Sequence, residues 1–393
     1  MNGGSDILVI GGGVIGLTIA RRLARDGIRV TVLERGRCGG ESSWAGAGVL
    51  APCNPHRHDA VAALRLRSLA MYPAFCRELL DETGIDPEYD ACGELEIAMN
   101  EDALRSLRDD AQAGAEMKTP DGSPAYVLHE PASARRLEPL VSEQALGALE
   151  VRQTAQVRNP RLLRALTTSC VRSGVTLREN TPAHDLELTG DRVTGVVTNG
   201  GVLRADRVVL CAGAWSSQIS GRLAELMPVH PVRGQVVLMK FEARALAHVI
   251  ARGKTYLVPR RDGHVILGAT EEHRSGFSKR NTAKGIAGLI EKGVQLVPSI
   301  ADAQVEATWA GLRPGTPDDN PYIGAVPGLD GLIAATGHFR AGLILAPITS
   351  EIVAELATPK TSGNVPAGGT APLPTAGLDL SACRSGRQLK AAP

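Results

Sequence analysis

Apolar and polar residues alternate in blocks at the start of the chain. Residues 6–10 form an apolar run typical of a buried parallel strand, residues 14–26 have the period of an amphipathic helix, and residues 29–33 form a second apolar run. Strand or helix patterns of the same kind return in three later segments: 207–212, 332–335 and 344–356. Together they predict an α/β fold that opens with a Rossmann-type βαβ unit.

Between these segments the pattern changes to long helices and closely spaced strands. Helical periods cover residues 60–83, 101–114 and 161–173. Strand patterns cover residues 93–99, 176–178, 186–188 and 192–198. From residue 229 to residue 270 strand follows strand, with Arg261-Asp262-Gly263 as a hairpin turn, which favours a mixed or antiparallel sheet.

The two patterns are interleaved along the chain and do not follow one another. We expect the Rossmann-type domain to consist of residues 6–83, 150–225 and 325–357, and the mixed or antiparallel-sheet domain of residues 84–149 and 226–324. Residues 358–393 are rich in Pro, Gly, Ser, Thr and Ala and lack an apolar period, so we expect a disordered tail there.

A glycine-rich turn stands between the first strand and the first helix. Gly11, Gly13 and Gly16 match G-x-G-x-x-G in the context that gives this motif its meaning, because a strand precedes it and a helix follows. Gly11 permits the tight turn, Gly13 lets a pyrophosphate approach the backbone, and Gly16 lets helix and strand pack closely. Glu34, at the end of the second strand, is placed to accept hydrogen bonds from a ribose. The sequence therefore predicts a dinucleotide site.

The motif alone does not separate NAD from FAD, but two later stretches favour FAD. SSWAGAG at residues 42–48 consists of small residues suited to close passage along a bulky planar ligand, although a plain loop is the alternative for this stretch alone. Residues 208–216 form a buried strand that ends in small residues including Gly213, as expected for a second approach to a nucleotide at the carboxyl edge of a parallel sheet. NAD enzymes have less need of a second chain segment that approaches the nucleotide.

Charge and cysteine content narrow the classes of partner. The formal net charge is +1, so no extended field would hold nucleic acid or an anionic membrane, and a small ligand is the expected partner. The first six residues lack the features of a signal peptide, and no apolar run reaches the roughly 18 residues of a membrane span. The seven scattered cysteines contain no C-x-x-C pair, and the nine histidines show no ligand spacing. We expect a cytoplasmic protein without a metal site, working as a homo-oligomer.

Four motifs in order resemble the glycine oxidases of the D-amino-acid oxidase family of flavoproteins. They are ESSWAGAGVLAP at residues 41–52, TYLVPRRDG at 255–263, WAGLRPGTPDDNPYIG at 309–324 and GHFRAGLILAP at 337–347. The resemblance runs from about residue 6 to residue 357. It implies a non-covalent FAD and oxidation of glycine, sarcosine or small D-amino acids to the imine, with O2 reduced to hydrogen peroxide. It also implies a link to thiamine thiazole synthesis.

Position by position, the resemblance implies two groups of site residues. FAD would contact Val14, Ile15, Glu34, Arg35, Ser42, Ser43, Ala47, Gly48, Val49, Ala183, His338, Phe339, Arg340, Ala341, Gly342, Leu343 and Ile344. Substrate would contact Arg313, Arg340 and Tyr256. The chain departs from some glycine oxidases at Lys254, where a histidine occurs, and at Ala341, where an asparagine is common, so pocket polarity and substrate preference are open.

An amino-acid substrate needs its carboxylate held while its Cα–H bond is aimed at the flavin. Arginine suits this because its planar fork makes two parallel hydrogen bonds to a carboxylate. Arg340 lies between two glycines and is our first choice for this role, with a surface arginine as the alternative. For Arg313 the alternative is a loop ion pair with Asp318 or Asp319. Tyr256 is either a carboxylate ligand or a core tyrosine, and Lys254 either lies near the amine or points to solvent.

Two other functions remain open from the sequence. One is an FAD-dependent D-amino acid dehydrogenase that passes electrons to an acceptor other than O2, for which no amphipathic membrane helix gives support. The other is a non-catalytic FAD-binding subunit, against which Arg340 and Arg313 argue. The expected reaction requires no catalytic triad and no paired carboxylates, because the flavin accepts the hydride and the protein orients the substrate.

Overall fold

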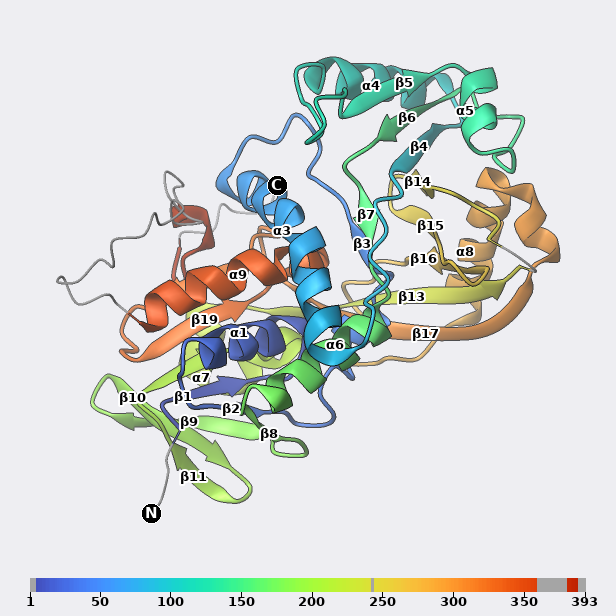
Figure 1. Ribbon diagram of the computed structural model, residues 1–393. Helices are drawn as coiled ribbons and strands as arrows, with labels where there is room; N and C mark the ends of the chain where they lie inside the picture. The colour runs from blue at the N-terminus through green and yellow to red at the C-terminus, as the bar shows by residue number, and fades with distance from the viewer. Residues whose placement is uncertain (1–4, 242–243, 359–379, 388–393) are drawn as a thin grey trace.

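Two large sheets organise the chain (Figure 1). The computed structural model describes residues 5–241, 244–358 and 380–387. The first sheet has six strands in the order β18-β19-β12-β1-β2-β8. Its parallel strands are β1 (Ile7–Ile10), β2 (Val30–Leu33), β8 (Thr176–Arg178), β12 (Arg207–Leu210) and β19 (Leu332–Thr336), and β18 (Tyr322–Ala325) runs antiparallel at one edge. All residues of β1 and β2 are buried, which explains their unbroken apolar runs.

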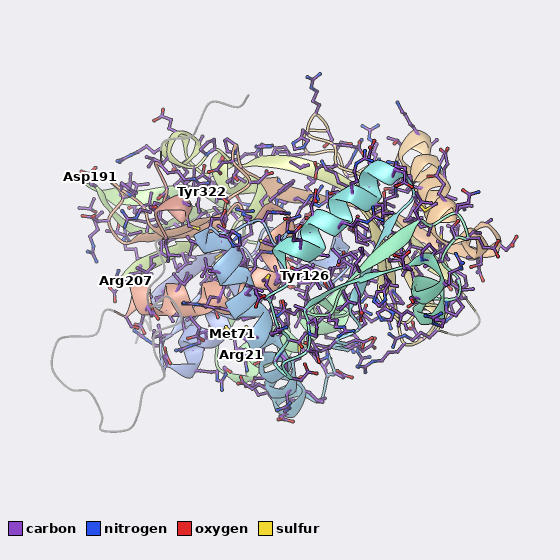
Figure 2. All side chains as sticks on the ribbon, turned by 90° about the horizontal axis from the view of Figure 1, so that it is seen from above. Arg21, Met71, Tyr126, Asp191, Arg207 and Tyr322 are labelled. Carbon is purple, nitrogen blue, oxygen red and sulfur yellow. The ribbon has the colours of Figure 1, made fainter. Side chains whose placement is uncertain are left out.

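Helices pack on one face of this sheet around a shared apolar core. They are α1 (Val14–Arg25), α3 (Ala60–Thr83), α6 (Asn159–Arg172) and α9 (Gly342–Ala357). The predicted helix 60–83 matches α3, whose N-cap Asp59 accepts a hydrogen bond from the backbone N–H of Ala62. Figure 2 shows Arg21 of α1 next to Met71 of α3, and the guanidinium of Arg21 donates to Glu82 on α3.

A smaller three-stranded sheet and short helices cover the opposite face. The sheet consists of β9 (Ala183–Thr189), β10 (Arg192–Thr198) and β11 (Gly201–Arg204). Beside it lie η1 (Gly213–Gln218) and α7 (Gly221–Leu226), which share a second apolar core with β12 and β19. Asp191, in the turn between β9 and β10, lies at the edge of the molecule (Figure 2).

The second large sheet has eight strands in the order β17-β13-β16-β15-β14-β4-β6-β5. Its strands are β4 (Glu94–Ala98), β5 (Tyr126–His129), β6 (Gly147–Val151), β13 (His230–Lys240), β14 (Val249–Arg252), β15 (Thr255–Pro259), β16 (His264–Gly268) and β17 (Gln304–Gly315). Its neighbours are antiparallel except β14 and β4. The helices α4 (Glu101–Ala113), α5 (Pro131–Leu137) and α8 (Ala283–Leu296) accompany it.

Short elements connect the two sheets. They are α2 (Ser42–Ala45), the strand pair β3 (Val49–Leu50) and β7 (Ala155–Gln156), and the 3-10 turn η3 (Phe339–Ala341). The 3-10 turn η2 (Pro298–Asp302) instead follows α8 and packs with it on the second sheet. The strands of each large sheet come from separated stretches of the chain, so the predicted fold class, a Rossmann-type sheet interleaved with a mixed sheet, is confirmed. The domain boundaries proposed above stay a prediction.

The apolar pattern did not reveal β17 and α8, and both have a physical reason. The first five residues of β17 are exposed, so they leave no apolar run. The helix α8 contains three glycines, which lower helix propensity. Two of them serve packing: a Cβ atom on Gly285 would lie 2.4 Å from Nε2 of Gln235, and one on Gly293 would lie 2.9 Å from the side chain of Leu267. Close approach of α8 to the sheet therefore outweighs propensity.

The expectation of a disordered tail over residues 358–393 is wrong for residues 380–387. Here η4 (Ser381–Cys383) packs beside α3 and β18, and Cys383 is fully buried. The backbone N–H of Gly386 donates to the carbonyl of Leu226, and Arg387 donates to Asp318 at 2.6 Å. A few anchoring contacts replace the apolar period that the sequence lacks. Residues 359–379 and 388–393 of the predicted tail lie outside the described residues.

The described residues contain neither a membrane-spanning helix nor a cluster of metal-ligating side chains. No helix in this part of the chain is long and apolar enough to cross a bilayer. Within the same residues, no group of three or more His, Cys, Asp or Glu side chains is arranged to hold a metal ion.

Candidate functional site

The turn between β1 and α1 brings the backbones of two strands close together. Gly11 has a φ of +107°, and a Cβ atom there would lie 2.3 Å from the carbonyl oxygen of Cys211, which follows β12. A Cβ atom on Gly16 would lie 2.0 Å from the carbonyl oxygen of Gly11. Both positions therefore require glycine, Gly11 for the turn and Gly16 for the packing of helix on strand.

The N-terminus of α1 opens into a cavity beside this turn. Gly13 is the N-cap residue and, as a glycine, offers no side chain to the N–H groups of the first turn. Gly13, Val14 and Ile15 line the cavity, and Oγ of Ser43 accepts a hydrogen bond from the N–H of Val14 at 3.0 Å. N–H groups at a helix start carry partial positive charge, so this end of the cavity suits phosphate groups.

Glu34 ends β2 and fixes the loop around the glycine turn. Its Oε2 accepts from the N–H of Gly12 and its Oε1 from the N–H of Gly36, both at 2.8 Å. Each carboxylate oxygen has a second lone pair, so Glu34 can still accept hydroxyl donors from a ribose in the cavity.

A second segment reaches the same cavity from the end of β12. Cys211, Ala212 and Gly213 line it, as the strand pattern of residues 208–216 predicted. Beyond them, the guanidinium carbon of Arg35 lies 3.8 Å from the ring centroid of Trp215, a cation–π contact that ties the end of β2 to η1.

The C-terminal turn between β19 and α9 closes one wall of the cavity. It contains His338, η3 and the first residues of α9, and no side chain within the described part caps α9. His338 is buried, which lowers the pKa of its imidazole to about 3, and its Nε2 lies 3.2 Å from Oγ1 of Thr349. His338 is therefore neutral, and the start of α9 presents backbone N–H groups to the cavity.

One cavity of about 490 Å³ brings together nearly all predicted site residues. Its lining includes Gly11, Gly13, Val14, Ile15, Glu34, Arg35, Ser42, Ser43, Ala47, Gly48, Val49, Ala183, Gly213, Tyr256, Arg313, His338, Phe339, Arg340, Gly342 and Leu343. Gly16, Ala341 and Ile344 do not line it: Gly16 packs on the Gly11 carbonyl, and Ala341 and Ile344 pack in the core under α9.

At the other end of the cavity, Arg313 presents a guanidinium that no carboxylate neutralises within the described residues. Arg313 lies near the end of β17, paired in register with Val232 of β13, and not in a loop, as the alternative of a loop ion pair assumed. Its Nη1 donates to the carbonyl oxygen of Thr270 at 3.0 Å. A Cβ atom on Gly234 would lie 2.5 Å from Nη1, so Gly234 makes room for the guanidinium. The alternative ion pair does not form, because Asp318 binds Arg387 instead.

Tyr256 lies on β15 and also lines this end of the cavity. Its ring packs against Gly268, where a Cβ atom would lie 2.9 Å from the ring edge. Among the described residues its hydroxyl has no hydrogen-bond partner, so the group is free to bind a ligand. The reading of Tyr256 as a core tyrosine with a satisfied hydroxyl is therefore not favoured.

Arg340 and Lys254 differ from Arg313 because both bind the same carboxylate. Arg340 donates to Oε2 of Glu271, and Nζ of Lys254 lies 2.5 Å from Oε1 of Glu271. Burial alone would raise the pKa of Glu271, but hydrogen bonds from Lys254 and Arg340 outweigh burial and lower it to about 2. The Lys254 side chain is 65% exposed, so it lies over the cavity rim and its charge is compensated there.

The sequence analysis missed two residues of this region. Asn159 lines the cavity and donates from Nδ2 to the carbonyl oxygen of Ser43 at 2.7 Å, while its buried Oδ1 has no partner among the described residues. Its place at the start of a predicted helix was the only signal. Glu271 gave no signal, because it follows the last strand of a hairpin like any surface acid.

Comparisons with known proteins point to one family. Residues 6–356 match the family described as "DAO: FAD dependent oxidoreductase". The chain is 41% identical over 375 residues to a glycine oxidase of Pseudomonas aeruginosa, covering 94% of this chain and 98% of that protein. It is 35% identical to the bifunctional protein ThiO/ThiG of Trichormus variabilis, covering 89% of this chain and 52% of that protein. The fold is similar to glycine oxidase from Geobacillus kaustophilus, with a TM-score of 0.88, 29% identity and coverage of 98% and 99% of the two chains.

Proposed function

Because the chain belongs to the DAO family of FAD-dependent oxidoreductases, we propose that it oxidises glycine or a related small amine, such as sarcosine or a small D-amino acid. The products are the imine, which water converts to the oxo acid, and hydrogen peroxide formed from O2. One observation carries the proposal: a single cavity joins a dinucleotide cradle to a guanidinium that has no carboxylate partner among the described residues.

The cradle fits FAD, the cofactor of the family. The N-terminus of α1 would hold the pyrophosphate, Glu34 the ribose, and the turn at the start of α9 the flavin. The buried Oδ1 of Asn159, which lacks a partner among the described residues, suits a hydrogen-bond donor from the cofactor. FAD supplies the hydride acceptor and the reaction with O2. No cysteine lies in the turn of residues 337–347, so we propose that the flavin is not tethered there.

Arg313 is the better candidate for the substrate carboxylate, although the sequence favoured Arg340. A carboxylate entering a partly dry pocket loses hydration and needs a cation whose charge is still available. Within the part of the chain that the structure describes, the guanidinium of Arg313 binds only a backbone carbonyl, whereas that of Arg340 already binds Glu271. The free hydroxyl of Tyr256 can donate a further hydrogen bond to the carboxylate.

With the carboxylate fixed at two points, the Cα–H bond of the substrate has one orientation in the cavity. The substrate ammonium must lose a proton before hydride can leave its carbon, and Lys254 would disfavour the ammonium if its own charge were free. Because Glu271 compensates that charge, we infer that Lys254 contributes little to the amine's protonation.

Three further proposals concern the metabolic role, the cellular location and the oligomeric state of the protein. The ThiO/ThiG likeness supports a link to thiamine thiazole synthesis through the imine product. The seven cysteines are free thiols, which supports a reducing, cytoplasmic setting. We also propose that the protein is a homo-oligomer, which light scattering would test.

An oxygen electrode tests the proposal with the purified yellow protein. Glycine, sarcosine and D-alanine should each be tried, with peroxide measured alongside oxygen uptake. If the protein oxidises these amines with dyes as electron acceptors but takes up no oxygen, it is a dehydrogenase and not an oxidase. A stable yellow protein that oxidises no amine would favour the alternative of a non-catalytic FAD-binding subunit.

A further inference from the structure

Glu271 binds side chains from distant parts of the chain at the rim of the cavity. Lys254 belongs to the turn between β14 and β15, and Arg340 belongs to the C-terminal turn before α9. Both contact Glu271, and Nε2 of His273 lies 3.4 Å from Oε1 of the same carboxylate. Only 11% of the Glu271 side chain is exposed. One carboxylate thus joins the two large parts of the molecule.

Glu271 lies behind the cavity wall, whereas its two partners form that wall. Lys254 and Arg340 line the cavity together with Arg313. Of these three cations, only Arg313 has no carboxylate partner within the described residues. With its pKa lowered to about 2, Glu271 stays ionised at every pH at which the enzyme would be assayed. The two cations at the rim are therefore held and compensated throughout.

We propose that Glu271 is a positioning residue that makes the pocket selective for amines with a single carboxylate. By holding Lys254 and Arg340, it leaves Arg313 as the cation of these three that is without a carboxylate partner among the described residues. The inference rests on the proposed function, because it assumes that amino acids enter this end of the cavity.

A second carboxylate on the substrate would meet an unfavourable charge environment in this pocket. A substrate that carries one on its nitrogen or side chain would place it at the rim, where the cations already have an anionic partner. It would have to displace Glu271 or lie beside it, and like charges in a half-buried site repel. Selectivity would thus come from a repulsive element as well as from attraction at Arg313.

Ligands that cannot be oxidised separate this inference from the proposed reaction. Methoxyacetate and oxydiacetate differ by one carboxylate, and isobutoxyacetate matches oxydiacetate in shape with an uncharged end. Their Kd values for the FAD-loaded enzyme would be measured by calorimetry. We expect the parent to bind methoxyacetate at least about tenfold more tightly than oxydiacetate, the scale of one modest charge interaction. Equal or tighter binding of oxydiacetate by the parent would overturn the inference.

Glu271→Gln keeps the shape of the side chain and removes its charge. We expect the preference for methoxyacetate over oxydiacetate to fall at least about tenfold in this variant, through tighter binding of oxydiacetate. Isobutoxyacetate should be unaffected. A parallel gain for isobutoxyacetate would mean that the change opened the pocket sterically, and an unchanged ratio would mean that Glu271 has no role in selectivity.

Three further variants control for structural effects. Glu271→Asp keeps the charge and should retain the parent preference. Glu272→Gln removes the neighbouring acid, which binds Arg233 and Gln235 and not the rim cations, so its ligand ratio should equal that of the parent. In Glu271→Gln combined with Lys254→Gln, most of the gain for oxydiacetate should be lost; a full gain there would overturn the charge argument.

Turnover gives an independent measurement of the same ratio. Sarcosine and iminodiacetate are the oxidisable counterparts of the two ethers. Glu271→Gln should lower the KM for iminodiacetate more than it changes kcat. If the parent oxidises no amine, the proposed function fails while the binding ratios still test the inference.

Discussion

The two ends of the cavity recognise their ligands by different means. At the dinucleotide end, the contacts come from backbone groups, from glycines whose Cβ atoms would collide, and from Glu34, which itself binds backbone N–H groups. At the substrate end, long charged side chains from β17, from the β14–β15 turn and from the C-terminal turn surround the space. Backbone geometry tolerates few substitutions, whereas charged side chains can be exchanged. The first end therefore fixes the cofactor, and the second is where substrate preference can change.

The largest effect is expected at the dinucleotide end, from Gly11→Ala. The new Cβ atom would lie 2.3 Å from the Cys211 carbonyl oxygen at a φ of +107°, so overlap and backbone strain should together cost roughly 2–5 kcal/mol. We expect colourless protein, measured as the ratio of flavin to protein absorbance. Gly221→Ala is the control, because nothing lies within 4 Å of its Cβ position and it should purify yellow. A yellow Gly11→Ala protein would show that the backbone end is more tolerant than its geometry indicates.

Arg313→Ala should have the largest effect at the substrate end. Loss of a guanidinium that has no carboxylate partner among the described residues should lower kcat/KM for glycine roughly thirtyfold to several thousandfold, which corresponds to about 2–5 kcal/mol. Arg313→Lys should recover only part of the rate, because it restores charge without the two-point geometry. FAD content should remain normal in both variants. Kinetics within threefold of the parent would exclude Arg313 as the carboxylate ligand.

Arg340→Ala should have a smaller effect than Arg313→Ala. The guanidinium of Arg340 already binds Glu271, so its loss should reduce kcat/KM by about tenfold or less, which corresponds to 1.4 kcal/mol or less. Steady-state kinetics with glycine at matched FAD content would compare the two variants. The reverse order would return the anchoring role to Arg340, as the sequence analysis expected.

What could be predicted from the sequence follows the same division. Gly11 and Glu34 occur at fixed spacings in a strand–turn–helix unit, so local pattern was enough to place them at a dinucleotide site. The partners of Arg340 and Lys254 could not be predicted, because Glu271 meets them only through the fold and follows no pattern. The position of Arg313 on a strand was missed because that strand begins with exposed residues. The residues that recognise the cofactor through the backbone lie close together in the sequence, whereas the carboxylate that compensates the cations at the substrate end lies far from them.

Tyr256→Phe should change substrate binding by the value of one hydrogen bond. Its hydroxyl has no partner among the described residues, so the variant leaves no buried group unpaired and should lose about 0.5–1.5 kcal/mol in binding of glycine. The expected result is a KM raised by roughly two- to tenfold with kcat changed less. Val258→Ala on the same strand is a packing control, since Val258 does not line the cavity and its loss should lower Tm more than it alters KM. An unchanged KM in Tyr256→Phe would place the carboxylate away from β15.

The smallest effect is expected from Arg387→Ala, which tests whether the substrate end also depends on an ion pair outside the cavity. The Arg387 guanidinium lies 4.0 Å from the ring centroid of Tyr322 and binds Asp318, in the loop that follows the strand of Arg313. Burial raises the pKa of the Asp318 carboxyl, but the hydrogen bond from Arg387 outweighs burial, so the net pKa is lowered.

A carboxyl with a lowered folded pKa stabilises the protein above its unfolded pKa, about 3.9, and this stability is lost as the pH falls toward the folded value. Arg387→Ala should therefore lower Tm by about 1–3 °C at pH 7, and the gap to the parent should narrow as the pH falls below about 3.9. Because the loop continues from the Arg313 strand, KM for glycine should rise about twofold, a change small beside that of Tyr256→Phe. Differential scanning fluorimetry across this pH range gives the first readout and steady-state kinetics the second. A Tm gap that does not narrow at all below about pH 3.9 would mean that Arg387 stabilises the segment through Tyr322 packing and not through Asp318.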